Sequence, residues 1–150
     1  MVGGGRGAFI GGVHRMAAAL DGEIELVCGA FSSDAERSKA SGEDLYLPAN
    51  RVYPNYEAMI LGEKALPENE RMDFVAIVTP NHMHYGPARM ALENGFHVVC
   101  DKPLAFNMEE AFELERLVKE TGLLFFFFFN YTGYPMVNQA KAMIANGELD

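Results

Sequence analysis

One apolar run near the middle of the chain constrains the fold more than any other feature. Residues 73–79, Asp-Phe-Val-Ala-Ile-Val-Thr, are almost continuously apolar and are followed by Pro80-Asn81. A strand with one solvated face alternates apolar and polar residues, so the lack of alternation predicts a strand buried on both faces of a parallel sheet. Because parallel strands need long crossover connections, which are usually helices, strands and helices should alternate on either side of this run.

The rest of the sequence fits this alternation. Further strands are predicted at residues 24–31, 51–53, 96–100 and 123–129. Helices are predicted directly after the glycines at residues 3–8, then from residue 34, over 56–64, over 83–94, after Asn107 as far as Gly122, and from Pro135 to Asn146-Gly147. The pattern indicates one doubly wound parallel α/β domain, of the Rossmann type, over residues 1–150.

Local signals sharpen three of these helices. Apolar residues recur at helical spacing after the glycines and predict a buried face there, formed by Phe9, Ile10, Val13, Met16, Ala17 and Leu20. Ser33 and Glu36 have the spacing of a capping box. Asn107 is expected to cap the next long helix, whose buried stripe is Ala111, Leu114, Leu117 and Val118.

Charge and cysteine content exclude several classes of protein. Twelve Lys and Arg against 21 Asp and Glu give a formal net charge of -9, which argues against nucleic acid or an anionic membrane as a partner. The two cysteines, Cys28 and Cys100, each follow an apolar run, as reduced thiols at strand ends would. Together with a start that lacks a secretory leader, they favour a cytoplasmic protein.

The glycine-rich start suggests how an acidic chain can bind an anionic ligand. Residues 3–8 read G-x-G-x-x-A before a predicted helix. Glycines let the backbone turn tightly and approach a pyrophosphate, which then accepts hydrogen bonds from free N–H groups at the helix N-terminus. The residues expected to bind the cofactor here are Gly3, Gly5, Arg6, Gly7, Ala8 and Phe9. Only Met1 and Val2 precede the loop, so the first strand is short and the natural start is expected upstream.

The end of the second strand leaves the cofactor open between NAD and NADP, with a slight preference for NAD. Ser32, Ser33 and Arg37 are suited to a 2'-phosphate, whereas Asp34 is suited to a plain ribose. An equally good interpretation of Ser33 is that it only caps its helix.

A lysine directly after a predicted strand is the candidate catalytic residue. Asp101-Lys102-Pro103 follows the strand that ends at Cys100, and the carboxyl ends of parallel strands face the ligand crevice. Beside an oxidised nicotinamide, Lys102 is placed to take a proton from an alcohol as hydride leaves. The alternative is a surface lysine in a turn fixed by Pro103. No metal site is predicted.

These motifs, in this order, resemble those of the glucose-fructose oxidoreductase, inositol dehydrogenase and MocA family (Gfo/Idh/MocA). The likeness rests on the glycine loop, on Thr79-Pro80-Asn81 with His82 and His84, and on Asp101-Lys102-Pro103. The resemblance implies that Lys102 contacts the substrate hydroxyl, with Asp101 in place of the more common Glu. It implies that Thr79, Pro80 and Asn81 border the nicotinamide and its ribose. His84 matches a histidine of the same loop, or is a helix-start residue with a solvated ring, and Asn130 and Tyr131 are expected to face the crevice.

The resemblance implies an oxidoreductase that transfers hydride between nicotinamide and a sugar, polyol or related carbinol. Family members continue into a C-terminal α/β substrate domain, which is missing here, so the isolated chain is expected to bind cofactor without efficient turnover. The full-length protein is expected to form homo-oligomers. The alternatives are a non-catalytic NAD(P)-sensing module and an S-adenosylmethionine-dependent methyltransferase, which would leave Asp101-Lys102-Pro103 unexplained.

A run of five phenylalanines, residues 125–129, is unusual for a strand. Five rings in alternating directions are expected to crowd one or both faces of the sheet, and at a sheet edge the run would be an aggregation hazard. Core packing, or an alteration of the natural sequence, explains the run better than an aromatic ligand site.

Overall fold

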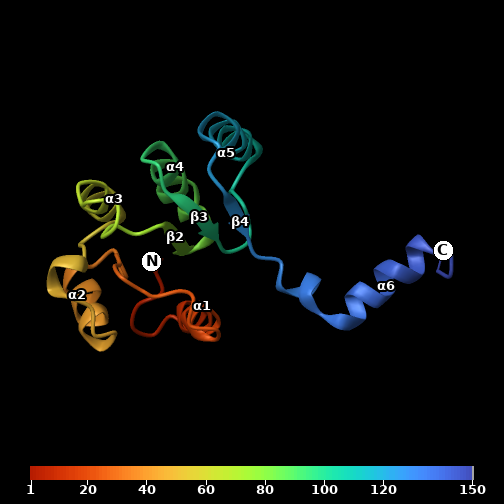
Figure 1. Ribbon diagram of the computed structural model, residues 1–150, viewed down its shortest axis with the longest axis horizontal. Helices are drawn as coiled ribbons and strands as arrows, with labels where there is room; N and C mark the ends of the chain where they lie inside the picture. The colour runs from red at the N-terminus through yellow and green to blue at the C-terminus, as the bar shows by residue number, and fades with distance from the viewer. Residues whose placement is uncertain (150) are drawn as a thin grey trace.

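The apolar run identified in the sequence forms the central strand of a parallel sheet. A computed structural model of the chain describes residues 1–149. Strand β2 (Phe74–Val78) pairs with β1 (Val2–Gly3) on one side and with β3 (His97–Cys100) on the other, and β4 (Phe125–Phe127) adds to β3 (Figure 1). All three pairings are parallel. The prediction of a doubly buried strand is confirmed, since β2 has strands on both edges and helices on both faces.

Beyond β1 the sheet continues only through isolated bridges. Ala30 lies opposite Val2, and Gly29 lies opposite Val52, both in parallel pairing. The predicted strands at 24–31 and 51–53 are therefore in the right places, but the first is wrong in extent. β1 is only two residues long and offers few backbone groups with which a longer strand could pair.

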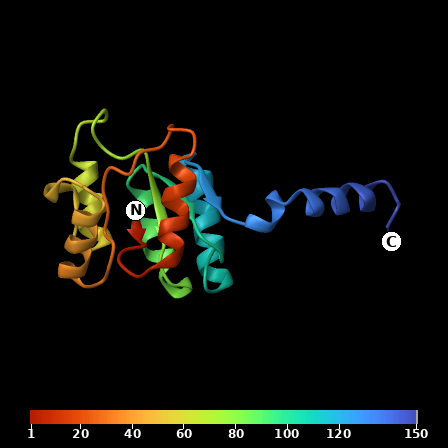
Figure 2. The same ribbon diagram turned by 90° about the horizontal axis from the view of Figure 1, so that it is seen from below.

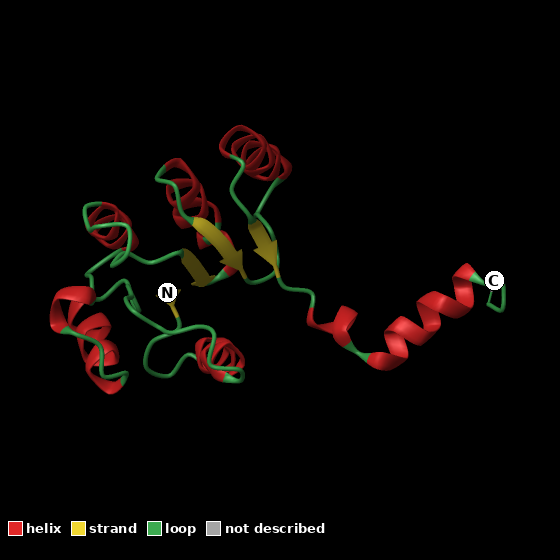
Figure 3. Cartoon of the chain, viewed as in Figure 1, coloured by secondary structure: helices red, strands yellow, loops and turns green. Residues whose placement is uncertain are grey.

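Helices cover both faces of the sheet, as predicted (Figures 1 and 3). Helices α3, α4 and α5 lie on one face, and α1 and α2 lie on the other. The helices are α1 (Phe9–Ala19), α2 (Ala35–Asp44), α3 (Tyr56–Lys64), α4 (Tyr85–Glu93), α5 (Met108–Thr121) and α6 (Pro135–Ala145). Across residues 1–149, no helix combines the length and the apolar character needed to cross a membrane.

Helix ends test the cap predictions. The Asn107 side chain accepts a hydrogen bond from the Glu110 N–H at 2.9 Å, and Gly122 ends α5 with a φ of 68°, so both predictions are confirmed. The capping box at Ser33 is wrong. Asp34 caps α2 instead, accepting from the Arg37 N–H at 2.8 Å, because Asp34 is the residue directly before the first helical residue.

The main core fills the space between the sheet and helices α3, α4 and α5. One buried carboxylate interrupts it: Glu63 of α3 has no solvent exposure. The Glu63 carboxylate accepts hydrogen bonds from two Arg51 guanidinium nitrogens, Nε at 2.8 Å and Nη2 at 2.7 Å, from the Tyr53 hydroxyl at 2.9 Å and from the Met72 N–H at 3.0 Å. A buried charge is tolerated only when it is fully paired, and this network ties α3 to the segment that pairs with Gly29.

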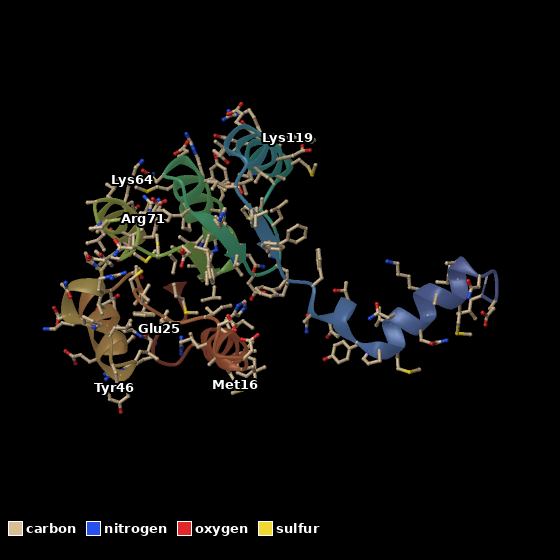
Figure 4. The ribbon with its side chains drawn as sticks, viewed as in Figure 1. Met16, Glu25, Tyr46, Lys64, Arg71 and Lys119 are labelled. Atoms are coloured by element: carbon tan, nitrogen blue, oxygen red, sulfur yellow. The ribbon has the colours of Figure 1, made fainter. Side chains whose placement is uncertain are left out.

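The apolar stripe of α1 is not buried, which contradicts the prediction. Phe9, Met16 and Leu20 are 84%, 71% and 82% exposed, and Gly11 is the buried residue of the helix. Ile10 and Gly11 face the sheet, and the described residues place no further element over the opposite side, where Met16 lies (Figure 4). Helix α6 has no buried residue, and it projects away from the sheet as an arm (Figures 1 and 2).

The phenylalanine run lies at the sheet edge and does not crowd the core. β4 is the last strand, and Phe126 to Phe129 are all at least 40% exposed. Expected overpacking is therefore absent among these residues, since only Phe125 packs against the main core. An exposed apolar edge strand is a template for association with another chain, so the predicted aggregation hazard stands.

Both cysteines are free, as predicted, and both are buried, which gives an alkaline pH dependence. Burial raises the pKa of Cys28 from 9.0 to about 11 and, with the nearby Asp101 charge, that of Cys100 to about 12. A thiol whose pKa is raised by folding stabilises the fold below its unfolded pKa and loses that contribution as the pH rises through the folded value. We expect the free energy of unfolding to fall from about pH 9 towards pH 11.

Urea denaturation across that range measures this effect. A Cys28→Ala/Cys100→Ala variant should be less stable at neutral pH but show a shallower alkaline fall. An equally steep fall in the variant would assign the pH dependence to other groups.

Candidate functional site

Strand register brings the predicted motifs to one edge of the sheet. Gly3 lies opposite Val78, and Ile77 lies opposite Cys100, so β1, β2 and β3 end within one residue of the same level. The segments that follow these strands therefore leave the sheet side by side, and the Asp101 N–H donates to the Ile77 carbonyl at 3.0 Å. In Figure 2 the loop after β1 and the turn after β2 both lie at the lower end of the sheet.

The glycine loop depends on the absence of side chains. Gly3, Gly4 and Gly7 have φ values of 79°, 73° and 77°, which L-residues with side chains rarely adopt. A Cβ on Gly5 would lie 2.6 Å from the Ser41 hydroxyl, and a Cβ on Gly11 would lie 2.4 Å from the Gly4 Cα. The closest approach of helix α1 to the loop is thus at Gly11, three residues beyond the predicted motif.

Three side chains outside the motif hold the loop in shape. Arg15 of α1 donates to the Gly4 carbonyl at 2.8 Å, and Arg37 of α2 donates to the Arg6 carbonyl at 2.6 Å. Ser41 of α2 accepts from the Arg6 N–H at 3.0 Å. Sequence reasoning missed Gly11, Arg15 and Ser41. Only Gly11 carried a signal, because a glycine inside an apolar helical pattern often marks close packing.

The loop retains the features that a pyrophosphate needs. The Arg6 and Ala8 N–H groups already have acceptors within the chain, whereas those of Gly5 and Gly7 have none among residues 1–149. The first N–H groups of α1, which begins at Phe9, point out of the helix without intrahelical partners. A pocket beside the loop is lined by Gly4, Gly5, Arg6, Gly7, Ala8, Arg15, Ser41, Asp44 and Leu45. Backbone donors, a helix N-terminus and space free of side chains fit a dinucleotide pyrophosphate.

The Arg6 side chain turns to α2. Its guanidinium forms a two-contact ion pair with Asp44, one contact being 2.7 Å between Nη2 and Oδ1, and this hydrogen bonding lowers the pKa of the Asp44 carboxyl. Both side chains are about half exposed, so the pair adds little to stability. Of the predicted loop residues, Arg6 is the one whose side chain is already paired.

The residues predicted to contact the adenosine ribose gather at the start of α2. The Ser32 hydroxyl accepts from the Asp34 N–H at 3.2 Å, and Asp34 caps the helix. Ser33 is exposed between them. Because Arg37 reaches back to the glycine loop, the two predicted cofactor-binding segments are joined through this one side chain.

The Thr79-Pro80-Asn81 segment follows β2 and turns at once. Asn81 begins a short 3₁₀ helix, η2 (Asn81–Met83), and the Thr79 hydroxyl donates to the Met83 carbonyl at 3.2 Å. His84 follows and is completely buried, so the alternative of a solvated ring is wrong. Its Nδ1 lies 2.7 Å from the Pro103 carbonyl oxygen and its Nε2 lies 3.0 Å from the Thr79 carbonyl oxygen.

Lys102 lies in the next loop, with its side chain exposed. The Asp101 carboxylate accepts a hydrogen bond from the Lys102 N–H at 2.8 Å, which fixes the backbone of the loop. Among residues 1–149, no acidic side chain forms an ion pair with the Lys102 ammonium, and no group of His, Cys, Asp and Glu residues is arranged to hold a metal ion. The lysine is therefore free to meet a ligand at this edge.

His14 of α1 also lies near this edge, although no sequence motif predicts it there. Its ring meets the ring of Phe128 edge-on, with 4.7 Å between centroids. Partial burial lowers the pKa of His14, an effect that the negative charge of Asp101 opposes. Asn130 and Tyr131 were both predicted to face the crevice. They are exposed and lie in the 3₁₀ helix η3 (Asn130–Gly133), just past β4.

The fold and the glycine loop define a dinucleotide-binding domain of the Rossmann type. Comparison with known proteins agrees: residues 1–129 match the GFO_IDH_MocA family, described as an oxidoreductase family with an NAD-binding Rossmann fold. The chain belongs to this family, as the motif resemblance implied.

Individual relatives support the assignment. The chain is 40% identical over 148 residues to the uncharacterized oxidoreductase YfiI of Bacillus subtilis, covering 98% of this chain and 37% of the relative. It is 30% identical over 145 residues to D-glucoside 3-dehydrogenase of Escherichia coli, covering 97% of this chain and 38% of the relative.

A solved structure of an inositol dehydrogenase homologue from Azotobacter vinelandii, in complex with NADH and myo-inositol, matches with a TM-score of 0.93 and 41% identity. The match covers 99% of this chain and 39% of that chain. The chain thus spans about two fifths of the length of these relatives.

Proposed function

We propose that this chain is the cofactor-binding domain of an NAD(P)-dependent dehydrogenase that acts on a sugar, polyol or related carbinol. The observation that carries the proposal is the strand register, which brings the glycine loop, residues 79–81 and Lys102 to one edge of the sheet. A dinucleotide whose pyrophosphate binds the glycine loop can extend along this edge past Thr79 towards Lys102. The printed names of relatives that act on sugars or hold an inositol support the substrate class.

Lys102 would control the proton in such a reaction. The bound nicotinamide would supply the hydride acceptor, and the hydride would leave the carbinol carbon. As the C–H bond breaks, the hydroxyl proton passes to the Lys102 amine and the C–O bond becomes a carbonyl. The reverse reaction returns the proton from the Lys102 ammonium to the alcohol oxygen.

The chain by itself presents one side of this site. We propose that a further domain of the full-length protein supplies most substrate contacts and the surfaces for homo-oligomer formation. The exposure of Lys102 supports this, because a lysine that works as a base needs a site shielded from bulk water.

We propose NAD as the preferred cofactor. Arg37 is the one cation among the residues predicted to contact the ribose, and its guanidinium already donates to the Arg6 carbonyl. The Asp34 carboxylate at the same helix start would repel a 2'-phosphate. Asp34→Ser removes the charge but keeps a residue that can cap α2. We expect the variant to shift the ratio of NADPH to NADH affinity about tenfold towards NADPH, the effect of about 1.4 kcal/mol.

Titration with NADH, NADPH and S-adenosylmethionine, followed by nicotinamide fluorescence and calorimetry, tests this proposal. Binding of NADH in preference to the other two supports it. Heat with S-adenosylmethionine alone would assign the chain to a methyltransferase, and an unchanged cofactor ratio in Asp34→Ser would remove the role given to Asp34.

A further inference from the structure

His84 is a buried polar residue that the proposed reaction does not yet use. It has no solvent exposure, and it lies between the Thr79 segment after β2 and the loop of Lys102 after β3. Its two ring nitrogens face two backbone carbonyl oxygens, those of Thr79 and Pro103, at 3.0 and 2.7 Å. One ring thus bridges the segment after β2 and the segment after β3.

The two carbonyl oxygens limit which hydrogen bonds the His84 ring can make. A carbonyl oxygen accepts hydrogen bonds and cannot donate them, and a neutral imidazole carries only one N–H. The ring therefore donates a hydrogen bond to at least one of the two carbonyls and lies in direct contact with the other, so either tautomer touches both loops.

We infer that His84 is a positioning residue whose ring joins the loop of Thr79 to the loop of Lys102 through its contacts with the Thr79 and Pro103 carbonyl oxygens. This role rests on the proposed function, in which Thr79 borders the nicotinamide and Lys102 moves the proton. Pro103 directly follows Lys102, so the bond to its carbonyl sets where the lysine backbone lies relative to residues 79–81. The distance from the hydride acceptor to the proton acceptor is then fixed through a residue that touches neither reactant.

Removal of the ring from the full-length protein tests this inference. His84→Gly should lower kcat by about 10- to 100-fold, since a misplacement of about 1 Å can cost a factor of 10² in rate. It should also weaken NADH binding, measured by fluorescence without substrate. Added imidazole, whose two ring nitrogens are both free to contact the carbonyls, should restore both quantities, whereas 1-methylimidazole, with one nitrogen blocked by a methyl group, should not.

A matched control separates positioning from loss of stability. Leu92 of α4 is buried like His84, but it belongs to the hydrophobic core. Leu92→Ala should lower the melting temperature without changing kcat or NADH affinity. A His84→Gly variant that behaves like Leu92→Ala, or that 1-methylimidazole restores as well as imidazole does, would overturn the inference.

Hydrogen exchange without any nucleotide distinguishes failure of this inference from failure of the proposed function. In His84→Gly, the amides of residues 79–83 and 101–104 should exchange faster together, and imidazole should slow both. Independent exchange of the two segments would refute the bridge even in an active enzyme. Coupled exchange in a protein that does not bind NADH would keep the bridge and reject the dehydrogenase.

Discussion

Replacing Lys102 by alanine in the full-length protein should lower turnover about 10²- to 10⁴-fold, the usual contribution of a positioned acid or base. NADH affinity should stay the same, because the pyrophosphate is proposed to bind the glycine loop and Lys102 lies at the other end of the proposed cofactor path. Steady-state kinetics give the first quantity, and fluorescence titration gives the second.

Two control variants make this result specific to proton transfer. Lys102→Arg keeps the positive charge, but a guanidinium does not give up its proton, so turnover should remain low. Lys119→Ala removes a lysine from the outer surface of α5, where it pairs only with Glu115 at 2.7 Å, and should have no effect (Figure 4). Unchanged function in Lys102→Ala would favour a cofactor-sensing protein over an enzyme.

Gly11→Ala should destabilise the chain and abolish cofactor binding. The new Cβ would lie 2.4 Å from the Gly4 Cα and 2.6 Å from the Gly4 carbonyl oxygen. Both are backbone atoms, so relief requires α1 or the loop to move. Overpacking of this kind costs about 1 to 3 kcal/mol, which for a domain of this size lowers the melting temperature by several degrees.

The neighbouring glycine provides the control. A Cβ on Gly12 would meet no atom within 4 Å, and Gly12 lies inside the same helix. Gly12→Ala should therefore stabilise the chain, by up to about 1 kcal/mol, through better helix propensity alone, with NADH binding retained. Thermal unfolding of the 150-residue chain measures both variants. Equal effects of the two substitutions would show that helix α1 does not depend on close approach to the loop.

The elements that could be predicted from sequence are those with strong local signals. The β2 run, the Asn107 cap and Pro135 at the start of α6 all depend on neighbouring residues, and all were correct. The predicted burial of the apolar stripe of α1 was wrong because burial depends on tertiary packing. Periodicity shows which side of a helix is apolar, but burial of that side requires another element to pack on it, and within residues 1–149 nothing does.

The candidate site also has features that could be predicted from sequence and features that could not. Register could be expected to align the motifs, because parallel strands end at one edge of a sheet. The roles of Arg15, Ser41 and His84 could not be expected, since each acts through a contact with a backbone carbonyl or amide that is distant in sequence or specific to one loop shape. Such contacts leave no periodic or spacing signal.

The sheet is unequal on the two sides of β1. β2, β3 and β4 share continuous ladders, whereas the segments around Gly29 and Val52 are held by single bridges. Regions with few backbone hydrogen bonds open locally at lower free energy than the centre of a sheet. The lysine therefore lies on the more stable side of the domain, and the segment predicted to contact the adenosine ribose lies on the less stable side. A dinucleotide that reaches across β1 would contact both sides of the domain. Part of its binding free energy would then offset the cost of ordering the protein segment at its adenosine end.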